Sequence, residues 1–124
     1  DTPLNRLVYT GNLEVDLLSI VEAYLETNAS FGEILPALLA ALPRHSELSG
    51  AFSMAWGNIQ VIIRIIQKYQ SDGLLKEEEP FLCLNALLGP LMTDQMFRRA
   101  KLDFPLPNID TKKYLNVFLA GRKK

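Results

Sequence analysis

The most regular pattern in the chain lies between Leu48 and Ser71, where polar residues recur at helical spacing in an apolar background. They are three or four residues apart and form one narrow stripe on a helix: Ser53, Gly57, Gln60, Arg64, Gln67 and Ser71. Large apolar residues occupy most of the remaining circumference, so the pattern predicts a central helix that other helices cover on several sides. Gly73 predicts its end, because glycine adopts the left-handed conformation without a Cβ clash.

Four further segments show helical periodicity. Asn12 is placed to cap a helix over residues 12–27, with Glu14 and Asp16 in its first turn. Residues 30–33 (Ser-Phe-Gly-Glu) read as a capping box that starts a second helix, which Pro43 ends. The remaining two helices are expected over residues 80–101 and from Asp110 to about 120. The chain is therefore predicted to be one all-α domain over residues 1–124, an orthogonal bundle of about five helices.

The boundaries of the later helices rest on charged and special residues. The acidic run 77–79 before Pro80 is typical of a helix N-terminus and is expected to be solvated. The Gly89-Pro90 pair is expected to bend the fourth helix. Asp110 is expected to cap the fifth and Gly121 to end it, with residues 122–124 trailing into solvent.

The apolar surface of the later helices exceeds what one face of a helix in a small monomer normally shows. The simplest arrangement pairs the last two helices with their copies across a two-fold axis, as an intermolecular four-helix bundle in a homodimer. The alternative is that all this surface is buried within one subunit. The residues expected at the interface are Leu87, Gly89, Leu91, Met96, Tyr114, Val117 and Phe118.

Composition narrows the class of protein. The 124 residues carry a net charge of −1, which lacks the basic excess of a nucleic-acid-binding surface. The single cysteine, Cys83, lies between two leucines and is expected to be a buried thiol in a reducing, cytoplasmic compartment. The apolar runs are too short and too interrupted to cross a bilayer, and the N-terminus has no signal-peptide pattern.

Little in the sequence indicates catalysis. His45 is the only histidine and lies far from Cys83 along the chain, which leaves little material for a zinc site or a nucleophilic pair. We expect His45 to lie in a solvated loop or to cap a helix. The seven glycines are scattered, without the spacing of a phosphate-binding loop. The sequence therefore predicts no metal, no cofactor and no enzymatic activity.

Four stretches in order resemble the C-terminal regulatory domain of the tetracycline-repressor (TetR) family. They are residues 65–75 (IIQKYQSDGLL), the acidic run 77–79 with Pro80, residues 86–91 (ALLGPL) and residues 114–121 (YLNVFLAG). The resemblance implies the effector-binding and dimerisation domain of a transcription regulator, most simply a repressor. The N-terminal helix-turn-helix domain of that family has no counterpart here. The missing initiator methionine agrees with a fragment, which would meet operator DNA only through the absent domain.

The resemblance also implies an effector pocket between the first, third and fourth helices. Its expected lining is Val21, Tyr24, Phe52, Trp56, Ile59, Ile63, Phe81, Asn85, Leu88 and Met92. Asn85 and Trp56 are the preferred candidates, because an amide or indole N–H among apolar neighbours must find a partner. Such a lining suits a hydrophobic or aromatic effector. Two alternatives stay open: plain core packing of these residues, and a small helical adaptor or carrier that binds a partner helix or an apolar ligand.

Overall fold

The structure, a computed structural model, describes residues 3–31, 34–101, 103 and 105–124. Within these ranges the regular structure is helical, which confirms the all-α prediction with about five helices. The elements are the 3₁₀ turns η1 (Pro3–Arg6) and η2 (Ser46–Leu48) and the helices α1 (Leu13–Phe31), α2 (Ile34–Ala41), α3 (Ser49–Ser71), α4 (Pro80–Arg99) and α5 (Thr111–Ala120).

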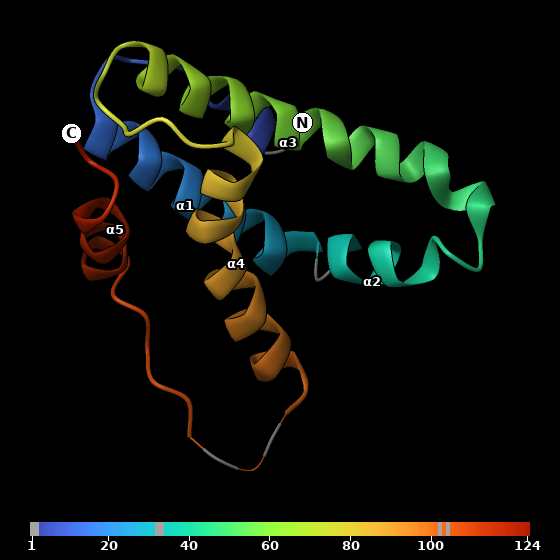
Figure 1. Cartoon of the computed structure of the whole chain (residues 1–124). Coiled ribbons are helices and arrows are strands. Elements are labelled where there is room, and N and C mark those ends of the chain that lie inside the picture. The colour runs from blue at the N-terminus through green and yellow to red at the C-terminus, as the bar shows by residue number, and fades with distance from the viewer. Residues whose placement is uncertain (1–2, 32–33, 102, 104) are drawn as a thin grey trace.

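Helix α3 spans one side of the molecule, with α1 and α2 running beneath it (Figure 1). Helix α4 leaves the turn after α3, crosses α1 at a steep angle and projects beyond it, and the chain then returns to α5 beside the first turns of α1. Contacts agree with this view: α1 packs against α4 and α5, α3 packs against α4, and α2 packs against α3.

The polar stripe of α3 faces solvent along its whole length. The expected central helix, covered on several sides, is not found, because α3 lies along one side of the molecule (Figure 1) and none of its described side chains before Ile62 is buried. All six of its residues are exposed, whereas Ile62, Ile65, Ile66 and Tyr69 on the opposite side are buried. Gly73 ends the helix with φ of 79°. The N–H of Leu74 bonds the carbonyl of Tyr69 at 3.0 Å and that of Gly73 bonds Gln70 at 3.1 Å, the two hydrogen bonds of a Schellman motif.

Side-chain caps fix three of the helix starts. Asn12 Oδ1 accepts from the backbone N–H of Val15 at 3.1 Å, and Glu79 accepts from the N–H of Phe81 at 2.8 Å, with Pro80 in the first turn of α4. Asp110 accepts from the N–H groups of Lys112 and Lys113. These caps satisfy backbone donors that the helix itself leaves unpaired.

Two predicted boundaries need correction. Helix α1 continues through residues 28–30 to Phe31, past its expected end at Thr27, so Ser30 lies inside a helix and does not start one. The other half of the expected capping box, Gly32 and Glu33, lies outside the described residues. Helix α4 runs through Gly89 and Pro90 as one element with Pro90 inside it, and the bend expected at this pair stays a prediction.

One buried apolar core joins α1, α3, α4 and α5. Its members without measurable exposure include residues from each of α1, α3 and α4 and from the turn that follows α3: Leu17, Ile20, Val21, Ile66, Tyr69, Leu75, Leu87 and Leu91. Burial of apolar side chains stabilises the fold by about 25 cal/mol per Å² removed from water. In the described part of the chain, no helix is long and apolar enough to cross a membrane.

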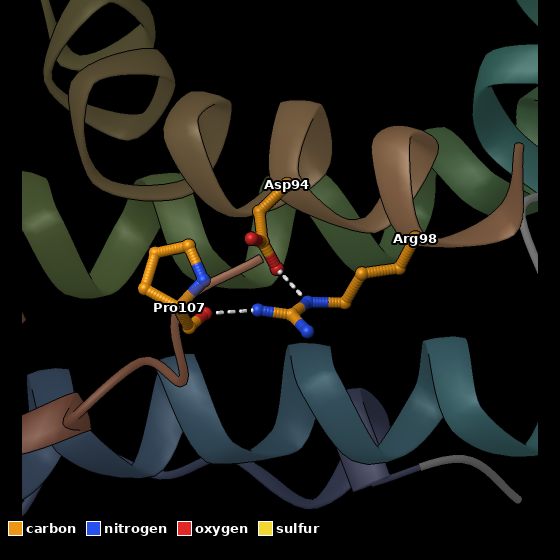
Figure 2. A network of polar contacts seen from close by, with 3 residues as sticks. All are labelled: Asp94, Arg98 and Pro107. Atoms are coloured by element: carbon orange, nitrogen blue, oxygen red, sulfur yellow. Dashed lines mark hydrogen bonds and ion pairs between the residues drawn. The ribbon is translucent and has the colours of Figure 1, made fainter. Parts of the chain in front are cut away.

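The side chain of Arg98 ties the extended segment before α5 to α4. Arg98 Nε lies 2.8 Å from Asp94 Oδ2, and the same guanidinium donates to the carbonyl of Pro107 (Figure 2). One donor of the Arg98 guanidinium bonds a side chain of α4 and another bonds the backbone of the segment before α5. This contact therefore fixes the position of Pro107 relative to α4.

Candidate functional site

Three aromatic side chains meet where the first half of α3 approaches the start of α4. Phe52 and Trp56 lie one helical turn apart on α3, with ring centroids 6.1 Å apart and an interplanar angle of 27°. Phe81 of α4 tilts against Trp56 at 5.9 Å and 51°. We call Phe52, Trp56 and Phe81 the aromatic cluster. Phe52 and Trp56 are half-buried and Phe81 is 39% exposed, so ring surface remains accessible to a ligand.

The surroundings of the aromatic cluster on α2 and α3 are almost uncharged. Between residues 34 and 63 the only ionisable side chains are Arg44, His45 and Glu47. All three are exposed at the turn between the helices, where His45 Nδ1 lies 3.3 Å from Glu47 Oε1. The exposure of His45 agrees with the predicted solvated loop. A neutral, flat, apolar group would therefore meet ring faces and uncharged side chains on the first half of α3, whereas on α4 the Glu79 carboxylate accepts from the backbone N–H of Phe81.

The other residues of the predicted pocket divide between core, margin and surface. Ile59, Ile63 and Met92 are partly buried at the edge of the core, and Val21, Tyr24 and Leu88 lie inside it. Asn85 is exposed one helical turn after Phe81, and its place in a pocket stays a prediction. Helix α4 packs through Cys83, Leu84, Leu87, Leu88 and Leu91, and residue 85 points away from that face because successive helical residues are about 100° apart.

The predicted dimer residues divide in the same way. Leu87 and Leu91 have no exposed surface and Phe118 is 7% exposed, because α1, α4 and α5 bury them within one subunit. Gly89 and Tyr114 are half-buried, and the Tyr114 hydroxyl donates to the carbonyl of Leu87. Of the seven, Met96 (48% exposed) and Val117 (77% exposed) present most surface to solvent.

Two open depressions on the surface involve none of the predicted pocket residues. One, between the start of α1 and the C-terminus, is lined by Glu14, Asn116, Leu119, Ala120, Lys123 and Lys124. The other, at the end of α3, is lined by Gln67, Gln70, Ser71, Glu77 and Glu78. The second lining is mainly polar and the first is mixed, in contrast to the aromatic cluster.

A buried carboxylate near the N-terminus was missed by sequence reasoning. Asp16 is 3% exposed and accepts hydrogen bonds from the Thr10 N–H at 2.8 Å, the Thr10 hydroxyl at 2.5 Å and the Tyr69 hydroxyl. Burial acts to raise its pKa, but these hydrogen bonds outweigh burial and hold the pKa below its usual value. Burial, and then Asp16, raises the pKa of Tyr69, which keeps its proton as a donor. The sequence contained a sign of this burial, because Asp16 lies between Leu13 and Ile20 on the apolar side of α1.

The C-terminal residues are held against the α3–α4 turn, which corrects the prediction that residues 122–124 trail into solvent. The N–H of Lys76 bonds the carbonyl of Arg122 at 2.8 Å, the N–H of Lys124 bonds that of Leu74 at 3.0 Å, and Leu75 and Lys123 form an antiparallel bridge. We call this contact of residues 122–124 with residues 74–76 the C-terminal clasp.

Side chains reinforce the C-terminal clasp. Arg122 Nε lies 3.1 Å from Glu78 Oε2, and its guanidinium carbon lies 4.9 Å from the centre of the Phe118 ring. Glu78 is half-buried, so the acidic run 77–79 is not simply solvated as expected. Cys83 is buried as predicted. Burial, followed by the nearby Glu78, raises the pKa of its thiol to about 11, which makes it a poor nucleophile at neutral pH.

Across the described ranges, no group of three or more His, Cys, Asp or Glu side chains is arranged to hold a metal ion. A comparison of the chain with protein-family models found no match, and comparisons with curated proteins and with solved structures found none either. The aromatic cluster therefore stands as a candidate site on its own geometry: rings that can stack on an apolar molecule, at the meeting point of two helices.

Proposed function

We propose that the chain is the effector-binding and dimerisation domain of a TetR-like transcription regulator in the cytoplasm, with the aromatic cluster as its effector site. The observation that carries the proposal is the cluster itself. Phe52, Trp56 and Phe81 come from two helices, keep accessible ring surface and have uncharged neighbours on α2 and α3. The effector class that fits is a neutral hydrophobic or aromatic molecule.

The regulatory step follows from linkage. An effector that binds more tightly to the state unable to bind DNA shifts the protein toward that state. The free energy of the shift cannot exceed the difference between the binding free energies of the effector for the two states. Operator DNA would be contacted by a helix-turn-helix domain outside this chain. Two such domains, held by a dimer, would read half-sites about one turn of DNA apart, and a changed separation would release them.

Fluorescence tests the effector site directly, because Trp56 is the single tryptophan. Titration with a library of neutral aromatic compounds should give saturable quenching for some members. Phe52→Ala and Phe81→Ala should each weaken that binding by about tenfold, since each removes one stacking partner worth roughly 1 kcal/mol or more. Phe97→Ala is the matched control on α4, exposed to a similar degree as Phe81. Absence of saturable quenching across the library would refute the effector site.

The pairing surface proposed for the homodimer is the outer side of α4 and α5, where Met96 and Val117 are exposed. In the full assembly these helices and their copies would form the intermolecular four-helix bundle. Sedimentation at low micromolar concentration should show a dimer that Val117→Glu dissociates. Val8→Glu is the control. Val8 is 67% exposed, close to the 77% of Val117, but it lies near the N-terminus. A wild-type monomer would contradict the pairing.

An adaptor or carrier that binds a partner helix is the second candidate. The observation that favours it is the surface beside the aromatic cluster, where Leu82 is 60% exposed next to Phe81. The coding sequence upstream of Asp1 distinguishes the two candidates. A basic helix-turn-helix segment there supports the regulator, and a native start near Asp1 supports the adaptor.

A further inference from the structure

The N-terminal residues 3–11 lie against α1 and α3. Leu4 and Leu7 pack against the apolar core, and the polar contacts of the segment involve two tyrosines. The rings of Tyr9 and Tyr69 lie 4.6 Å apart at 42°, and Lys68 Nζ lies 5.0 Å from the centre of the Tyr9 ring. The Tyr9 hydroxyl donates to Asp72 Oδ2 just beyond α3. We call residues 3–11 the N-terminal strap.

Asp16 is shared between the N-terminal strap and α3. Its Oδ2 accepts from the backbone N–H of Thr10, which belongs to the strap, and from the hydroxyl of Tyr69, which belongs to α3. Its Oδ1 accepts from the Thr10 hydroxyl. Since Asp16 and Tyr69 are both buried, a lost donor is not freely replaced by water, and the remaining donors must reorganise around the carboxylate.

We infer that Asp16, Tyr69 and Tyr9 form a latch that couples the position of α3 to attachment of the N-terminal strap. A shift of the last turns of α3 moves Tyr69 and Lys68 together with the adjoining Asp72. The ring contact, the cation above the ring and the hydroxyl bond to Asp72 then weaken at the same time as the bond to Asp16. The attachments at Tyr9 and Thr10 are therefore lost together, while Leu4 and Leu7 keep their packing against the core.

This latch is independent of the effector site proposed above, since it needs no ligand. Its functional consequence is that a movement of α3 reaches the N-terminal end of the chain. The aromatic cluster carries two of its rings at the other end of the same 23-residue helix. Any event that displaces α3 at the aromatic cluster therefore also favours loss of the strap attachments at Tyr9 and Thr10. By linkage, loss of these attachments favours the displacement of α3 by the same free energy.

Amide hydrogen exchange followed by NMR tests the latch at named positions. In Tyr69→Phe, the Thr10 N–H should exchange about tenfold faster, because a buried carboxylate loses a hydrogen bond. Amides of α4 and α5 should keep their protection. Tyr114→Phe is the matched control, because it removes a tyrosine hydroxyl bonded to the Leu87 carbonyl, away from the strap. It should leave Thr10 unchanged.

The reciprocal variant tests the coupling. Thr10→Val removes the strap hydroxyl and should speed exchange at the N–H groups of Gly73 and Leu74, which close the end of α3. Tyr9→Phe, at the accessible side of the latch, should loosen Thr10 by a smaller factor without endangering the fold. Unchanged exchange at Thr10 in Tyr69→Phe, or at Gly73 in Thr10→Val, would overturn the latch. So would an equal rise at every core amide, which would indicate loss of the whole fold.

Discussion

Asp16 shows how a residue that fits a simple rule can serve a different purpose. An acidic residue in the first turn of a helix is favoured by the helix dipole, and this reason sufficed for the sequence prediction. In the structure the Asp16 carboxylate also accepts hydrogen bonds from Thr10 and from the buried Tyr69. Sequence separation hid the partner, since Tyr69 comes from another helix.

Acid should weaken the fold through Asp16. A carboxyl whose pKa is lowered on folding contributes stability above its unfolded pKa, about 3.9, and loses it as the pH falls through the folded pKa. Asp16→Asn should therefore cost about 1–3 kcal/mol at neutral pH. The gap from the wild type should begin to narrow below about pH 4 and close only once the pH is below the lower, folded pKa. Urea unfolding followed by circular dichroism at both pH values measures the gap.

The control for this experiment is Glu14→Gln on the same helix. The pKa of Glu14 is also lowered, mainly by Lys123, but both side chains are about half exposed. An exposed pair contributes at most about 1 kcal/mol, so this variant should show a small gap at either pH. A gap for Asp16→Asn that persists unchanged in acid would contradict the assigned role.

At the scale of elements, the sequence predicted helix ends correctly where the residue that caps or ends the helix acts on backbone groups a few residues away. Asn12, Glu79 and Asp110 cap helices and Gly73 ends one, because each acts on its own backbone neighbours. The C-terminal clasp was missed for the opposite reason. Arg122 finds Glu78 only after the chain has folded, and three basic residues at a terminus carry no periodic pattern.

Gly57 within α3 and Gly73 just after it should respond oppositely to alanine. Gly73 has φ of 79°, so Gly73→Ala should destabilise the protein by about 1 kcal/mol through the backbone alone. Gly57 lies within α3, and Gly57→Ala should stabilise it by about 0.5–1 kcal/mol. An added Cβ meets no atom within 4 Å at either position, so packing does not confuse the comparison. Thermal unfolding of both variants checks the signs, and equal signs would refute the argument.

Removing the cation of the C-terminal clasp should cost more than removing an exposed one. Arg122→Gln leaves the half-buried Glu78 without its guanidinium partner, and we expect a loss of about 1–2 kcal/mol in the free energy of unfolding. Lys123→Gln breaks only the exposed contact with Glu14 and should cost under about 0.5 kcal/mol. Chemical denaturation of the two variants measures the difference, and equal losses would show that Glu78 is well solvated without Arg122.

At the scale of the whole molecule, burial is uneven along α3. Among its side chains that are described, none before Ile62 is buried, whereas four between Ile62 and Tyr69 are. The first half instead packs against α2 and the η2 turn and carries the aromatic cluster. The candidate binding site therefore lies in the less buried half, where a ligand has most to gain by completing the packing.

Hydrogen exchange should reveal this gradient. Amides between Ser49 and Gln60 should exchange through local openings, and those between Ile62 and Tyr69 only through near-global unfolding. Adding Nile red, a neutral aromatic dye, should slow exchange in the first half if the dye occupies the aromatic cluster. Uniform protection along α3 in the free protein would contradict the expected gradient.

Periodicity identified which side of each helix is buried but not what buries it. The pattern around Leu87 and Leu91 was correctly taken as apolar surface that needs cover, yet α1 and α5 of the same subunit provide that cover. Asn85 lies outside the buried face of α4 because one position along a helix changes the direction of a side chain by about 100°. The meeting of Phe52 and Trp56 with Phe81 needed the relative placement of two helices, which spacing alone does not contain.

Both ends of the chain are attached to the same small region around the end of α3. The N-terminal strap contacts Tyr69 and Asp72, and in the C-terminal clasp residues 122–124 pair with residues 74–76. A pulling force applied between the two termini would therefore load these attachments first and reach the packed helices only after they give way. In mechanical terms, the end of α3 is the anchor point of the molecule, and extension should begin there with the helices still intact.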